Sequence, residues 1–464
     1  MKSPLWGNEI RTVYFIGIGG IGMSAIARYF LAQGVAVSGY DKTPTTLTRE
    51  LEAAGIAVHY AEDIEQIPKE VQLVVFTPAV PGNHKELLYY RENGYPVLKR
   101  SEVLGMITGS SFNICIAGTH GKTTITTMVA HLLRHTGYGC NAFLGGISVN
   151  YGTNFWSSEK NVCVIEADEY DRSFLKLNPD IAVISSMDAD HLDIYGTAED
   201  MEMAFIDFSA KVKAGGVLVS KFGLKRGKDL KTGRQLRYSL RDQSADVYAE
   251  NIRIKGGAYL FDIIIKGKMI KDLELKMGGM HNIENMAAAI AVADSLDIDP
   301  AGIREAVASF RGVKRRFEYI INEEKIVFID DYAHHPEELR ALINGARSLF
   351  GAKKCTVIFQ PHLYSRTRDH ATGFAEVLDQ ADTVILLPVY PARELPIEGV
   401  SSAMIMERMK NEKKQVLSKE ELLKWIGTNY IKNIRQEPGS VLITAGAGDI
   451  DGLVEPIKNI LSGI

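Results

Sequence analysis

Residues 113–124 read NICIAGTHGKTT, and this stretch decides how the rest of the sequence is interpreted. The apolar residues at 114–117 predict a buried strand, and apolar residues at helical spacing within 125–133 predict a helix. A glycine-rich turn between a strand and a helix directs backbone N–H groups and the positive end of the helix dipole at an anion. The stretch therefore predicts a phosphate-binding loop, in which Lys122 reaches the β- and γ-phosphates of a nucleotide and Thr123 ligates Mg²⁺.

This loop departs from the general phosphate-loop pattern, which has a glycine five residues before Gly121. Ile116 occupies that position, and Gly118 follows two residues later. A chance Gly-Lys-Thr at a helix N-terminus is the alternative, but the strand before the loop and the helix after it favour the phosphate loop. We expect ATP to contact the whole turn: Gly118, Thr119, His120, Gly121, Lys122, Thr123 and Thr124.

Length and composition fit a soluble enzyme. The chain has 464 residues, enough for two to four domains, with 46% apolar and 24% charged residues. A net charge of −4 gives no reason to expect nucleic acid as a partner. The four cysteines lie far apart, without the spacing of a zinc site or a disulfide framework, which favours a reducing cytosol.

The apolar segment 13–32 does not predict a membrane span, because glycines and Arg28 interrupt it. No signal peptide is visible, since charged residues continue through Glu9 and Arg11 without a small-residue cleavage site. We therefore expect a cytoplasmic protein without membrane insertion, as a monomer or weak homodimer.

The N-terminal segment carries a dinucleotide-binding pattern. A strand predicted at Thr12–Ile16 leads into GIGGIG at 17–22 and a helix through Ala32, and a second strand at Val35–Gly39 ends at Asp41. An acidic residue about 20 positions after the first glycines can accept a hydrogen bond from a ribose hydroxyl. This stretch alone favours an NAD-binding Rossmann unit, but a nucleotide-sugar diphosphate would suit the same turn equally well.

Acidic residues follow two further predicted strands. The strand at Asn161–Ile165 leads into EADE at 166–169, and the strand at Ile181–Ser186 leads into DADHLD at 188–193. In an open parallel sheet, ligands bind beyond the carboxyl ends of the strands, so these groups and the phosphate loop should meet at one edge. That combination predicts a Mg²⁺–nucleotide site, in which His191 can bind a second metal ion. Solvated carboxylates and a structural histidine are the alternatives.

Residues 245–277 alternate between apolar and polar and predict antiparallel strands appended to the central domain. A helix follows at Met286–Leu296. Asn282 and Asn285, just before it, can bind an adenine edge or simply cap the helix. Arg315 and Arg316 lie in a predicted linker, as a solvated pair or as arginines that reach a phosphate.

The last third repeats strand–helix units, with Pro336 beginning a helix. Its strands are predicted at Lys325–Ile329, Cys355–Phe359, Thr383–Leu387 and Val441–Thr444. We therefore predict an α/β fold of three domains. A Rossmann-like domain spans 1–108, a phosphate-loop domain with a mostly parallel sheet and appended antiparallel strands spans 109–314, and a second Rossmann-like domain spans 315–464. These features indicate a Mg²⁺–ATP-dependent enzyme and leave kinase, ligase and motor-like NTPase open.

Seven motifs occur in the order found in Mur ligases, and the chain resembles that family over nearly its whole length. The motifs are Gly17–Ser24, Gly118–Thr124, Glu166–Glu169, Asp190–Asp193, His281–Asn282, Arg315–Phe317 and Asp330–Pro336. The resemblance is strongest to the member that adds L-alanine to UDP-N-acetylmuramate in peptidoglycan precursor synthesis. It implies that ATP phosphorylates the muramyl carboxylate to an acyl phosphate, which the amine of L-alanine then attacks.

The resemblance also implies the site residues and cofactors. It implies ATP and Mg²⁺, an N-terminal domain that binds UDP rather than NAD, and a C-terminal domain that completes the ATP site and admits the amino acid. The UDP-sugar residues would be Gly19, Gly20, Ile21, Gly22, Met23, Asp41 and Thr77. Beyond the loop, ATP would contact His281, Asn282, Asn285, Arg316 and Asp331. The metal ligands would be Thr123, Glu166 and His191, the catalytic residues Lys122, His191 and Arg316, and the L-alanine site Tyr332, His334 and Arg366.

Two positions depart from patterns within the family. Leu363 follows His362 where many members have a basic residue, which leaves the choice among alanine, glycine and serine open. Ile206 stands where later-acting relatives carry a carbamylated lysine, so we predict no carbamylation. Three other functions stay open: a ligase that joins a murein tripeptide to the same sugar nucleotide, an NAD-dependent oxidoreductase, and a non-catalytic sugar-nucleotide sensor.

Overall fold

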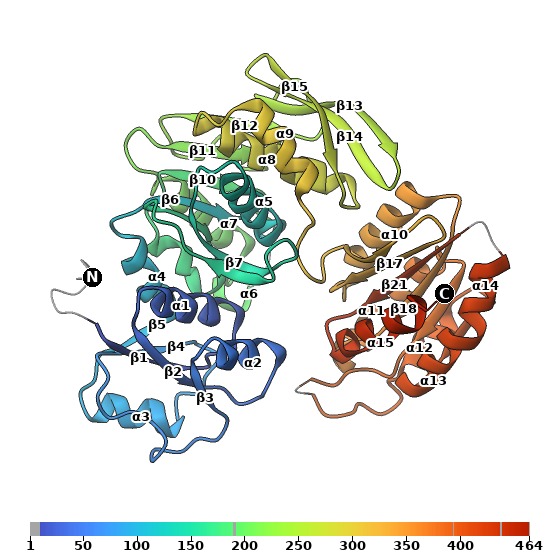
Figure 1. The fold of residues 1–464 in the computed structure, drawn as a ribbon, viewed down its shortest axis with the longest axis horizontal. Coiled ribbons are helices and arrows are strands. Elements are labelled where there is room, and N and C mark those ends of the chain that lie inside the picture. The colour runs from blue at the N-terminus through green and yellow to red at the C-terminus, as the bar shows by residue number, and fades with distance from the viewer. Residues whose placement is uncertain (1–9, 189–191, 393, 437–438, 464) are drawn as a thin grey trace. The chain divides into compact units, whose positions relative to one another are not determined.

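The computed structural model describes residues 10–188, 192–392, 394–436 and 439–463. Its strands form three sheets with helices packed on them, which confirms the predicted α/β class (Figure 1). The chain divides into two compact units. The first comprises residues 1–250, 262–271 and 284–309, and the second comprises 251–261, 272–283 and 310–464.

The first sheet is parallel throughout, with the order β3-β2-β1-β4-β5. This is the doubly wound order of a Rossmann-like unit, as predicted. Its strands are β1 (Thr12–Ile16), β2 (Ala36–Tyr40), β3 (Ala57–His59), β4 (Leu73–Phe76) and β5 (Val97–Lys99). Its helices are α1 (Ile21–Ala32), α2 (Thr46–Ala53), α3 (Lys85–Glu92) and α4 (Arg100–Thr108).

The second sheet has ten strands in the order β15-β14-β13-β12-β11-β10-β6-β9-β7-β8. The run from β13 to β7 is parallel, and β7 pairs antiparallel with β8 at one edge. The strands are β6 (Phe112–Ala117), β7 (Asn141–Ser148), β8 (Thr153–Trp156), β9 (Val162–Glu166), β10 (Ile181–Ile184), β11 (Val217–Lys221), β12 (Gln235–Ser239), β13 (Val247–Lys255), β14 (Ala258–Ile265) and β15 (Lys268–Leu275). The helices are α5 (Lys122–His135), η1 (Tyr170–Lys176), α6 (Leu192–Tyr195), α7 (Ala198–Ser209), α8 (Met280–Ser295) and α9 (Pro300–Ser309).

The first two sheets share one hydrophobic core, because buried side chains of α1 pack on strands of both. Tyr29 of α1 lies 5.7 Å from Phe143 of β7 and 6.0 Å from Phe155 of β8, measured between ring centroids. The Asn154 side chain of β8 donates hydrogen bonds to the carbonyl oxygen of Ile21 (2.6 Å) and to Ser24 Oγ (2.9 Å). The start of α1 is therefore fixed against the central sheet.

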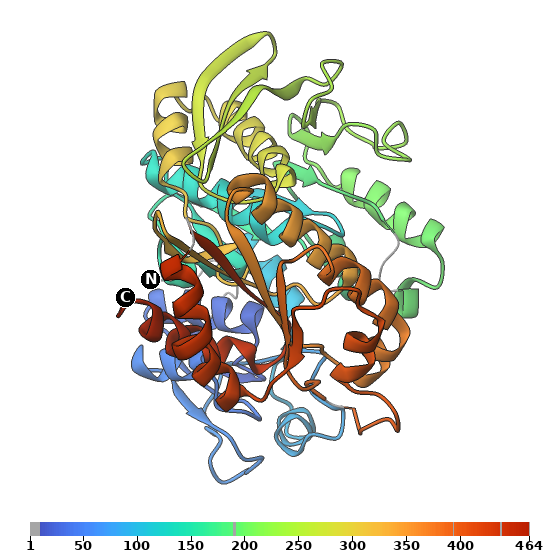
Figure 2. The ribbon, with the colours of Figure 1, turned by 90° about the vertical axis from the view of Figure 1, so that its right-hand side faces the viewer.

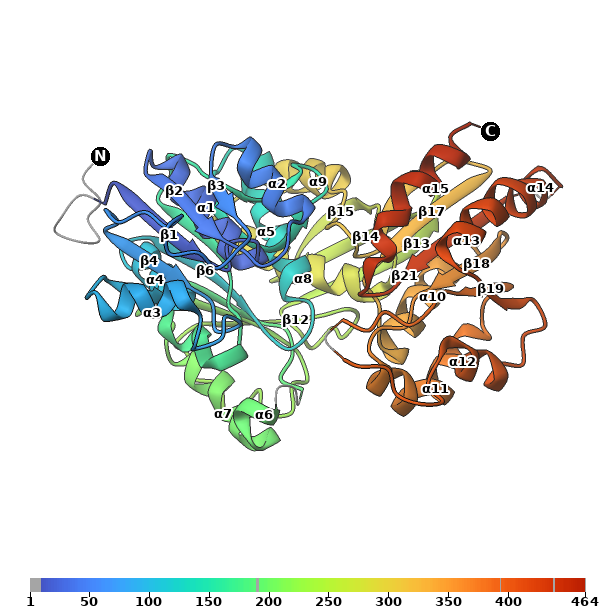
Figure 3. The same ribbon diagram turned by 90° about the horizontal axis from the view of Figure 1, so that it is seen from below.

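The third sheet has the order β16-β17-β21-β18-β19-β20, with only β16 antiparallel to its neighbour among the described strands. Helices cover both of its faces, so it is a second doubly wound unit, as predicted (Figures 2 and 3). The strands are β16 (Glu318–Asn322), β17 (Ile326–Asp331), β18 (Lys354–Phe359), β19 (Thr383–Leu386), β20 (Lys414–Val416) and β21 (Ser440–Ala445). The helices are α10 (Pro336–Phe350), α11 (Tyr364–Leu378), α12 (Ser402–Arg408), α13 (Lys419–Trp425), η2 (Ile426–Tyr430), α14 (Ile431–Gln436), η3 (Asp449–Leu453) and α15 (Val454–Leu461).

Two details differ from the sequence predictions. Helix α8 begins at Met280 instead of Met286, because its first turns carry polar residues that hide the apolar periodicity. The linker that holds Arg315, predicted at Phe310–Glu318, ends before Glu318, which already belongs to β16. In the part of the chain that the structure describes, none of the helices is both long and apolar enough to cross a membrane.

Candidate active site

The stretch 113–124 forms the predicted strand, turn and helix. Strand β6 ends at Ala117, and α5 begins at Lys122. Gly121 precedes the helix with φ +82°, and Gly118 has φ +132°, a conformation that favours glycine. No side chain caps the start of α5, so its first N–H groups remain available for an anion.

Two serines at the end of the next strand hold this loop in place. Ser186 Oγ accepts a hydrogen bond from the backbone N–H of His120 (2.8 Å) and lies 2.8 Å from Thr119 Oγ1. Ser185 Oγ donates to the carbonyl oxygens of Ala117 (3.2 Å) and of His120. The backbone N–H of Ser186 lies 2.8 Å from where a Cβ on Gly118 would be, so this glycine has no room for a side chain.

Lys122 is held at the mouth of the loop by two oxygens. Its ammonium group lies 2.8 Å from the carbonyl oxygen of Gly118 and 2.6 Å from Oε1 of Glu169. The Glu169 side chain is 1% exposed, and the hydroxyl of Tyr195 donates to the Glu169 carbonyl oxygen (2.6 Å). Burial raises the pKa of Glu169 even though Lys122 opposes that shift.

The predicted meeting of loop and acidic residues is confirmed for the described part of the chain. Strand β6 lies between β9 and β10, so Glu166 at the end of β9 is level with Ile116 of β6. Thr123, in the first turn of α5, is 5% exposed. The carboxylate of Glu166 and the hydroxyl of Thr123 are hard oxygen donors of the kind that Mg²⁺ prefers, so these residues fit that ion. His191, predicted as a further metal ligand, lies outside the described residues.

The other glycine turn, between β1 and α1, is held by an acidic side chain. The backbone N–H of Gly19 donates to Oδ2 of Asp41 (2.7 Å), and Thr43 N–H donates to Oδ1 (3.2 Å). Gly17 has φ +85°, and a Cβ there would lie 2.7 Å from Cγ2 of Thr77. Asp41 and Thr77 thus shape the loop, whereas contact of Asp41 with a ribose stays a prediction.

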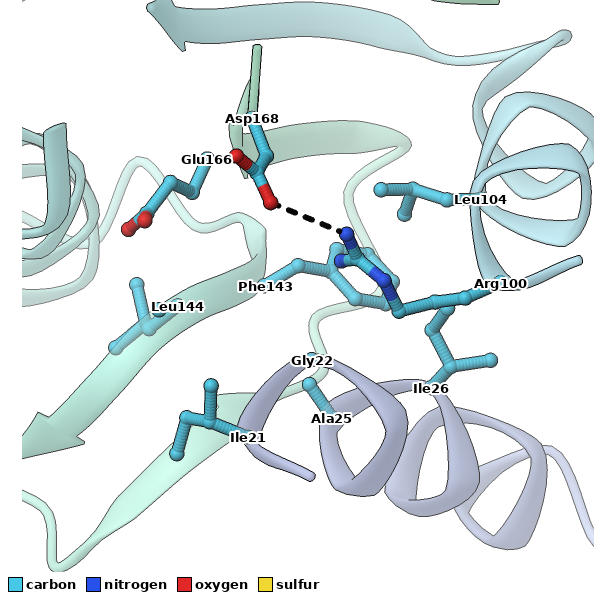
Figure 4. Close-up of a pocket in the computed structure, with 11 residues that line it drawn as sticks. Ile21, Gly22, Ala25, Ile26, Arg100, Leu104, Phe143, Leu144, Glu166 and Asp168 are labelled. Atoms are coloured by element: carbon cyan, nitrogen blue, oxygen red, sulfur yellow. Dashed lines mark hydrogen bonds and ion pairs between the residues drawn. The ribbon is translucent and has the colours of Figure 1, made fainter. Parts of the chain in front are cut away.

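A cavity of about 140 Å³ lies where α1, α4, β7 and β9 meet, within the first unit (Figure 4). Ile21 and Gly22 line it from α1, and Glu166 and Asp168 line it from the end of β9. Arg100, the first residue of α4, points its guanidinium group into this space toward Asp168. The predicted sugar-nucleotide loop and the predicted metal ligand therefore border one cavity.

The two asparagines that are predicted to contact ATP both lie in helix α8, but their surroundings differ. Asn285 Oδ1 lies 3.0 Å from the position of a Cβ on Gly121, so this side chain borders the phosphate loop. Asn282 is 2% exposed, and its side-chain amide donates to the carbonyl oxygen of Gly278 (2.6 Å). The His281 ring packs against Gly279. Asn282 thus stabilises its own turn, and contacts of these residues with adenine stay predictions.

In the second unit, the two arginines of the 310–318 segment differ. Arg315 has φ +60°, and its guanidinium Nε lies 3.4 Å from Oδ2 of the buried Asp330. Burial raises the pKa of Asp330 to about 7, and Arg315 lowers it only in part. Arg316 is exposed. Arg315 therefore has a structural role, whereas contact of the exposed Arg316 with a phosphate stays a prediction.

Asp331 is used within its own domain. Its Oδ2 accepts a hydrogen bond from the backbone N–H of Phe317 (2.6 Å), and its Oδ1 accepts one from Ala333 (2.7 Å). The first bond fixes the turn that carries Arg316, and the second fixes the turn after β17. Contact of Asp331 with adenosine stays a prediction.

The three residues predicted for the amino acid lie close together. The rings of Tyr332 and His334 are 5.2 Å apart, and those of His334 and His362 are 6.2 Å apart, between centroids. Arg366 Nη1 lies 3.3 Å from Nδ1 of His362. Leu363, between these last two, has φ +69°, which is uncommon for a leucine. The second unit thus presents a cation among aromatic rings at the ends of β17 and β18.

Models of all three Mur ligase domains match the sequence. The Mur ligase family catalytic domain matches residues 12–111, the Mur ligase middle domain matches 116–293, and the glutamate ligase domain matches 315–448. The chain belongs to the Mur ligase family.

Similar members of this Mur ligase family come from several bacteria. The UDP-N-acetylmuramate–L-alanine ligase of Flavobacterium johnsoniae is 46% identical over 98% of this chain and 99% of its own. The protein of the same name from Porphyromonas gingivalis is 47% identical over 97% and 99%. The crystal structure of UDP-N-acetylmuramate-alanine ligase from Thermotoga maritima superposes with a TM-score of 0.83 at 29% identity, covering 97% of this chain and 99% of that one.

Sequence reasoning missed four residues of this Mur ligase site: Glu169 as the partner of Lys122, Ser185 and Ser186 as supports of the loop, and Arg100 in the cavity. Glu169 belongs to the EADE motif at 166–169, and both serines end a predicted strand. Arg100 carried no signal, because it begins a short helix at the edge of a different sheet.

Proposed function

We propose that this Mur ligase joins L-alanine to the carboxylate of UDP-N-acetylmuramate, with cleavage of ATP to ADP and phosphate. The proposal rests above all on one observation: a lysine-bearing phosphate loop lies beside a strand that ends in acidic residues, next to a second glycine turn of the same unit. The names of the relatives that match nearly the whole chain support the choice of substrates.

The chemistry requires activation because a carboxylate is a poor acyl donor. A carboxylate oxygen of the sugar acid attacks the γ-phosphorus of ATP, the bond to the β-phosphate oxygen breaks, and ADP leaves. The amine nitrogen of L-alanine then attacks the acyl carbon and loses a proton, and the tetrahedral intermediate expels inorganic phosphate. Both steps move negative charge, so fixed positive groups beside the phosphates lower the barriers.

The residues of the first unit suit the phosphoryl step. The free N–H groups of α5 and the Lys122 ammonium would hold the β- and γ-phosphates, in place of the Gly118 carbonyl and Glu169 that Lys122 contacts here. Glu166 and Thr123 would hold Mg²⁺, with His191 as the further predicted ligand. When bound, Mg²⁺ neutralises phosphate charge during the transfer.

In the second unit, Arg366 would bind the carboxylate of L-alanine, since a guanidinium group pairs with a carboxylate through two parallel hydrogen bonds. Tyr332 and His334 would border the same site, and Arg316 would stabilise the transferred phosphoryl group. These roles carry over from the family motifs. We also place the reaction in the cytoplasm, where ATP and reduced cysteines coexist; the four cysteines are free and buried.

An ADP-release assay with UDP-N-acetylmuramate tests the proposal. We expect release to depend on the sugar nucleotide and to be stimulated by L-alanine more than by glycine or L-serine. Stimulation by a murein tripeptide but not by L-alanine would assign the chain to the recycling reaction instead. ADP release without any sugar nucleotide, or tight NADH binding without ATP turnover, would contradict the proposal altogether.

A further inference from the structure

The cavity between α1 and the end of β9 holds one cation and two acids among its described lining residues. The cation is Arg100, and the acids are Glu166 and Asp168. Figure 4 shows the Arg100 guanidinium crossing the cavity from α4, with Asp168 opposite it. This arrangement needs an explanation. Arg100 points at Asp168 and so brings positive charge close to Glu166, which is predicted to bind a metal cation.

The bond between Arg100 and Asp168 is weak by its geometry. Arg100 Nη2 lies 3.5 Å from Oδ2 of Asp168, at the outer limit of a hydrogen bond, and the two side chains are 23% and 37% exposed. Asp168 also accepts a hydrogen bond from the backbone N–H of Tyr170 (3.1 Å). A partly solvated pair at this distance contributes little to stability. Asp168 is therefore a partner that Arg100 can exchange for another anion.

Gly22 leaves room for the guanidinium group of Arg100. A Cβ on Gly22 would lie 2.6 Å from Nη1 of Arg100 and 3.2 Å from Cζ. The third glycine of a dinucleotide fingerprint usually allows a helix to pack on its strand. Here the absence of a side chain in the first turn of α1 also lets the guanidinium group lie against the helix backbone.

Helix α1 presents a second positive feature at the same point. Its N-cap residue, Gly20, makes no side-chain capping bond, so the first N–H groups and the positive end of the helix dipole are available. The hydrogen bonds from Asn154 to Ile21 and Ser24 fix this turn against the central sheet. The N-terminus of α1 and the guanidinium group of Arg100 are therefore held near each other at the cavity.

We infer that Arg100 binds an oxyanion of the sugar nucleotide and releases Asp168 when it does so. This inference rests on the proposed function and adds to it a residue that selects the anionic substrate. Arginine suits the role because its planar fork pairs with phosphate or carboxylate oxygens through two hydrogen bonds. The released Asp168 carboxylate is no longer neutralised by Arg100, so its negative charge favours binding of a cation beside Glu166.

Calorimetric binding of UDP-N-acetylmuramate to the full chain, without ATP or metal, tests the exchange. Arg100→Met keeps the apolar stem but removes the charge. We expect about tenfold weaker binding, because the charge-assisted hydrogen bonds to the oxyanion are lost. Asp168→Asn removes the competing anion, and we expect unchanged or tighter binding. A purely structural ion pair predicts weaker binding for both variants, whereas exchange predicts weaker binding for Arg100→Met alone.

The chain offers a matched control in Arg28, which lies on α1. Arg28 Nη2 lies 3.1 Å from Oε2 of Glu50, with side chains 18% and 36% exposed, and neither residue lines the cavity. Arg28→Met should bind the sugar nucleotide as the wild type does. Wild-type binding by Arg100→Met, or weakening by Asp168→Asn equal to that of Arg100→Met, would overturn the inference.

UDP alone distinguishes the two possible oxyanions. If Arg100 contacts the diphosphate, Arg100→Met weakens UDP and UDP-N-acetylmuramate equally; if it contacts the sugar acid, only the latter is weakened. In the ADP-release assay the same variant should raise the KM for the sugar nucleotide about tenfold and leave the KM for ATP unchanged. Failure of L-alanine to stimulate the wild type would sink the proposed function, while the binding results would stand by themselves.

Discussion

The first unit contains two turns of the same local design, β1–α1 and β6–α5, and they are stabilised differently. In β1–α1, the carboxylate of Asp41 accepts the Gly19 N–H, and no lysine is present in the turn. In β6–α5, Ser185 and Ser186 hold the loop, and Lys122 spans it to reach Glu169. Both helices begin without a side-chain cap.

Under the proposed function, this difference matches a turn that only holds a ligand and a turn that also promotes a reaction. A glycine turn with free N–H groups is enough to bind a diphosphate that does not change. A transferred phosphoryl group needs positive charge that follows it, and a lysine on a flexible stem provides this. The ion pair with Glu169 holds that charge at the mouth of the loop.

The largest effect should come from Lys122→Ala. We expect kcat to fall at least about 100-fold, on the order of 3 kcal/mol, because the charge that stabilises the γ-phosphoryl group is lost. Binding of the sugar nucleotide should not change, since the β1–α1 turn is intact. ADP release and calorimetry measure the two quantities.

The control for this variant addresses folding. Removing Lys122 leaves the buried Glu169 without its partner, which is destabilising in itself. The double variant Lys122→Ala/Glu169→Gln should recover the melting temperature but not the activity. Recovery of activity in the double variant would show that Lys122 serves only to neutralise Glu169.

A smaller effect is expected on the free energy of unfolding, which glycine-to-alanine substitutions in the two turns should change by different amounts. Gly118→Ala places a Cβ against Ser185 at φ +132°, and we expect a loss of about 2–4 kcal/mol from strain and overpacking. In the other turn Gly20 has φ −64°, and the nearest atom to its Cβ would lie 3.6 Å away, so Gly20→Ala should cost less than about 1 kcal/mol. Thermal unfolding of both variants measures this, and equal losses would mean that the turns are equally constrained.

The local parts of both turns were predictable from the sequence. Strand β1 has the predicted bounds, Thr12–Ile16, and helix α10 begins at Pro336 as predicted. Apolar periodicity and glycine or proline positions determine such elements within a few residues of chain. By contrast, the sequence did not predict β7 or β8. Gly145 and Gly146 interrupt the apolar pattern of β7, which pairs with β9, and the short β8 depends on its pairing with β7.

The partners of the site residues were not predictable, because they are distant in sequence. Glu169 lies 47 positions from Lys122, and Arg100 lies 68 positions from Asp168. The order of strands, with β6 between β9 and β10, brings Glu169 to Lys122, and the packing of α4 on η1 brings Arg100 to Asp168. The acidic residue at the end of β2 shows the opposite case, since the fingerprint assigns Asp41 to a ribose while the folded turn uses it to bind Gly19.

The smallest effect is on how stability depends on pH. It concerns the ion pair between Lys122 and Glu169, which belongs to the β6–α5 turn. Burial raises the pKa of Glu169 above that of an unfolded glutamate, so the folded protein binds the extra proton more tightly. Stability contributed by this group is therefore present below about pH 4.3 and declines as pH rises through the raised pKa. Glu169→Gln removes this decline, so its melting temperature should rise relative to wild type between pH 4 and pH 7, by a few degrees at most. A relative fall over the same range would mean that Lys122 stabilises the carboxylate more than burial opposes it, and that the ammonium group is bound too firmly to move to a nucleotide.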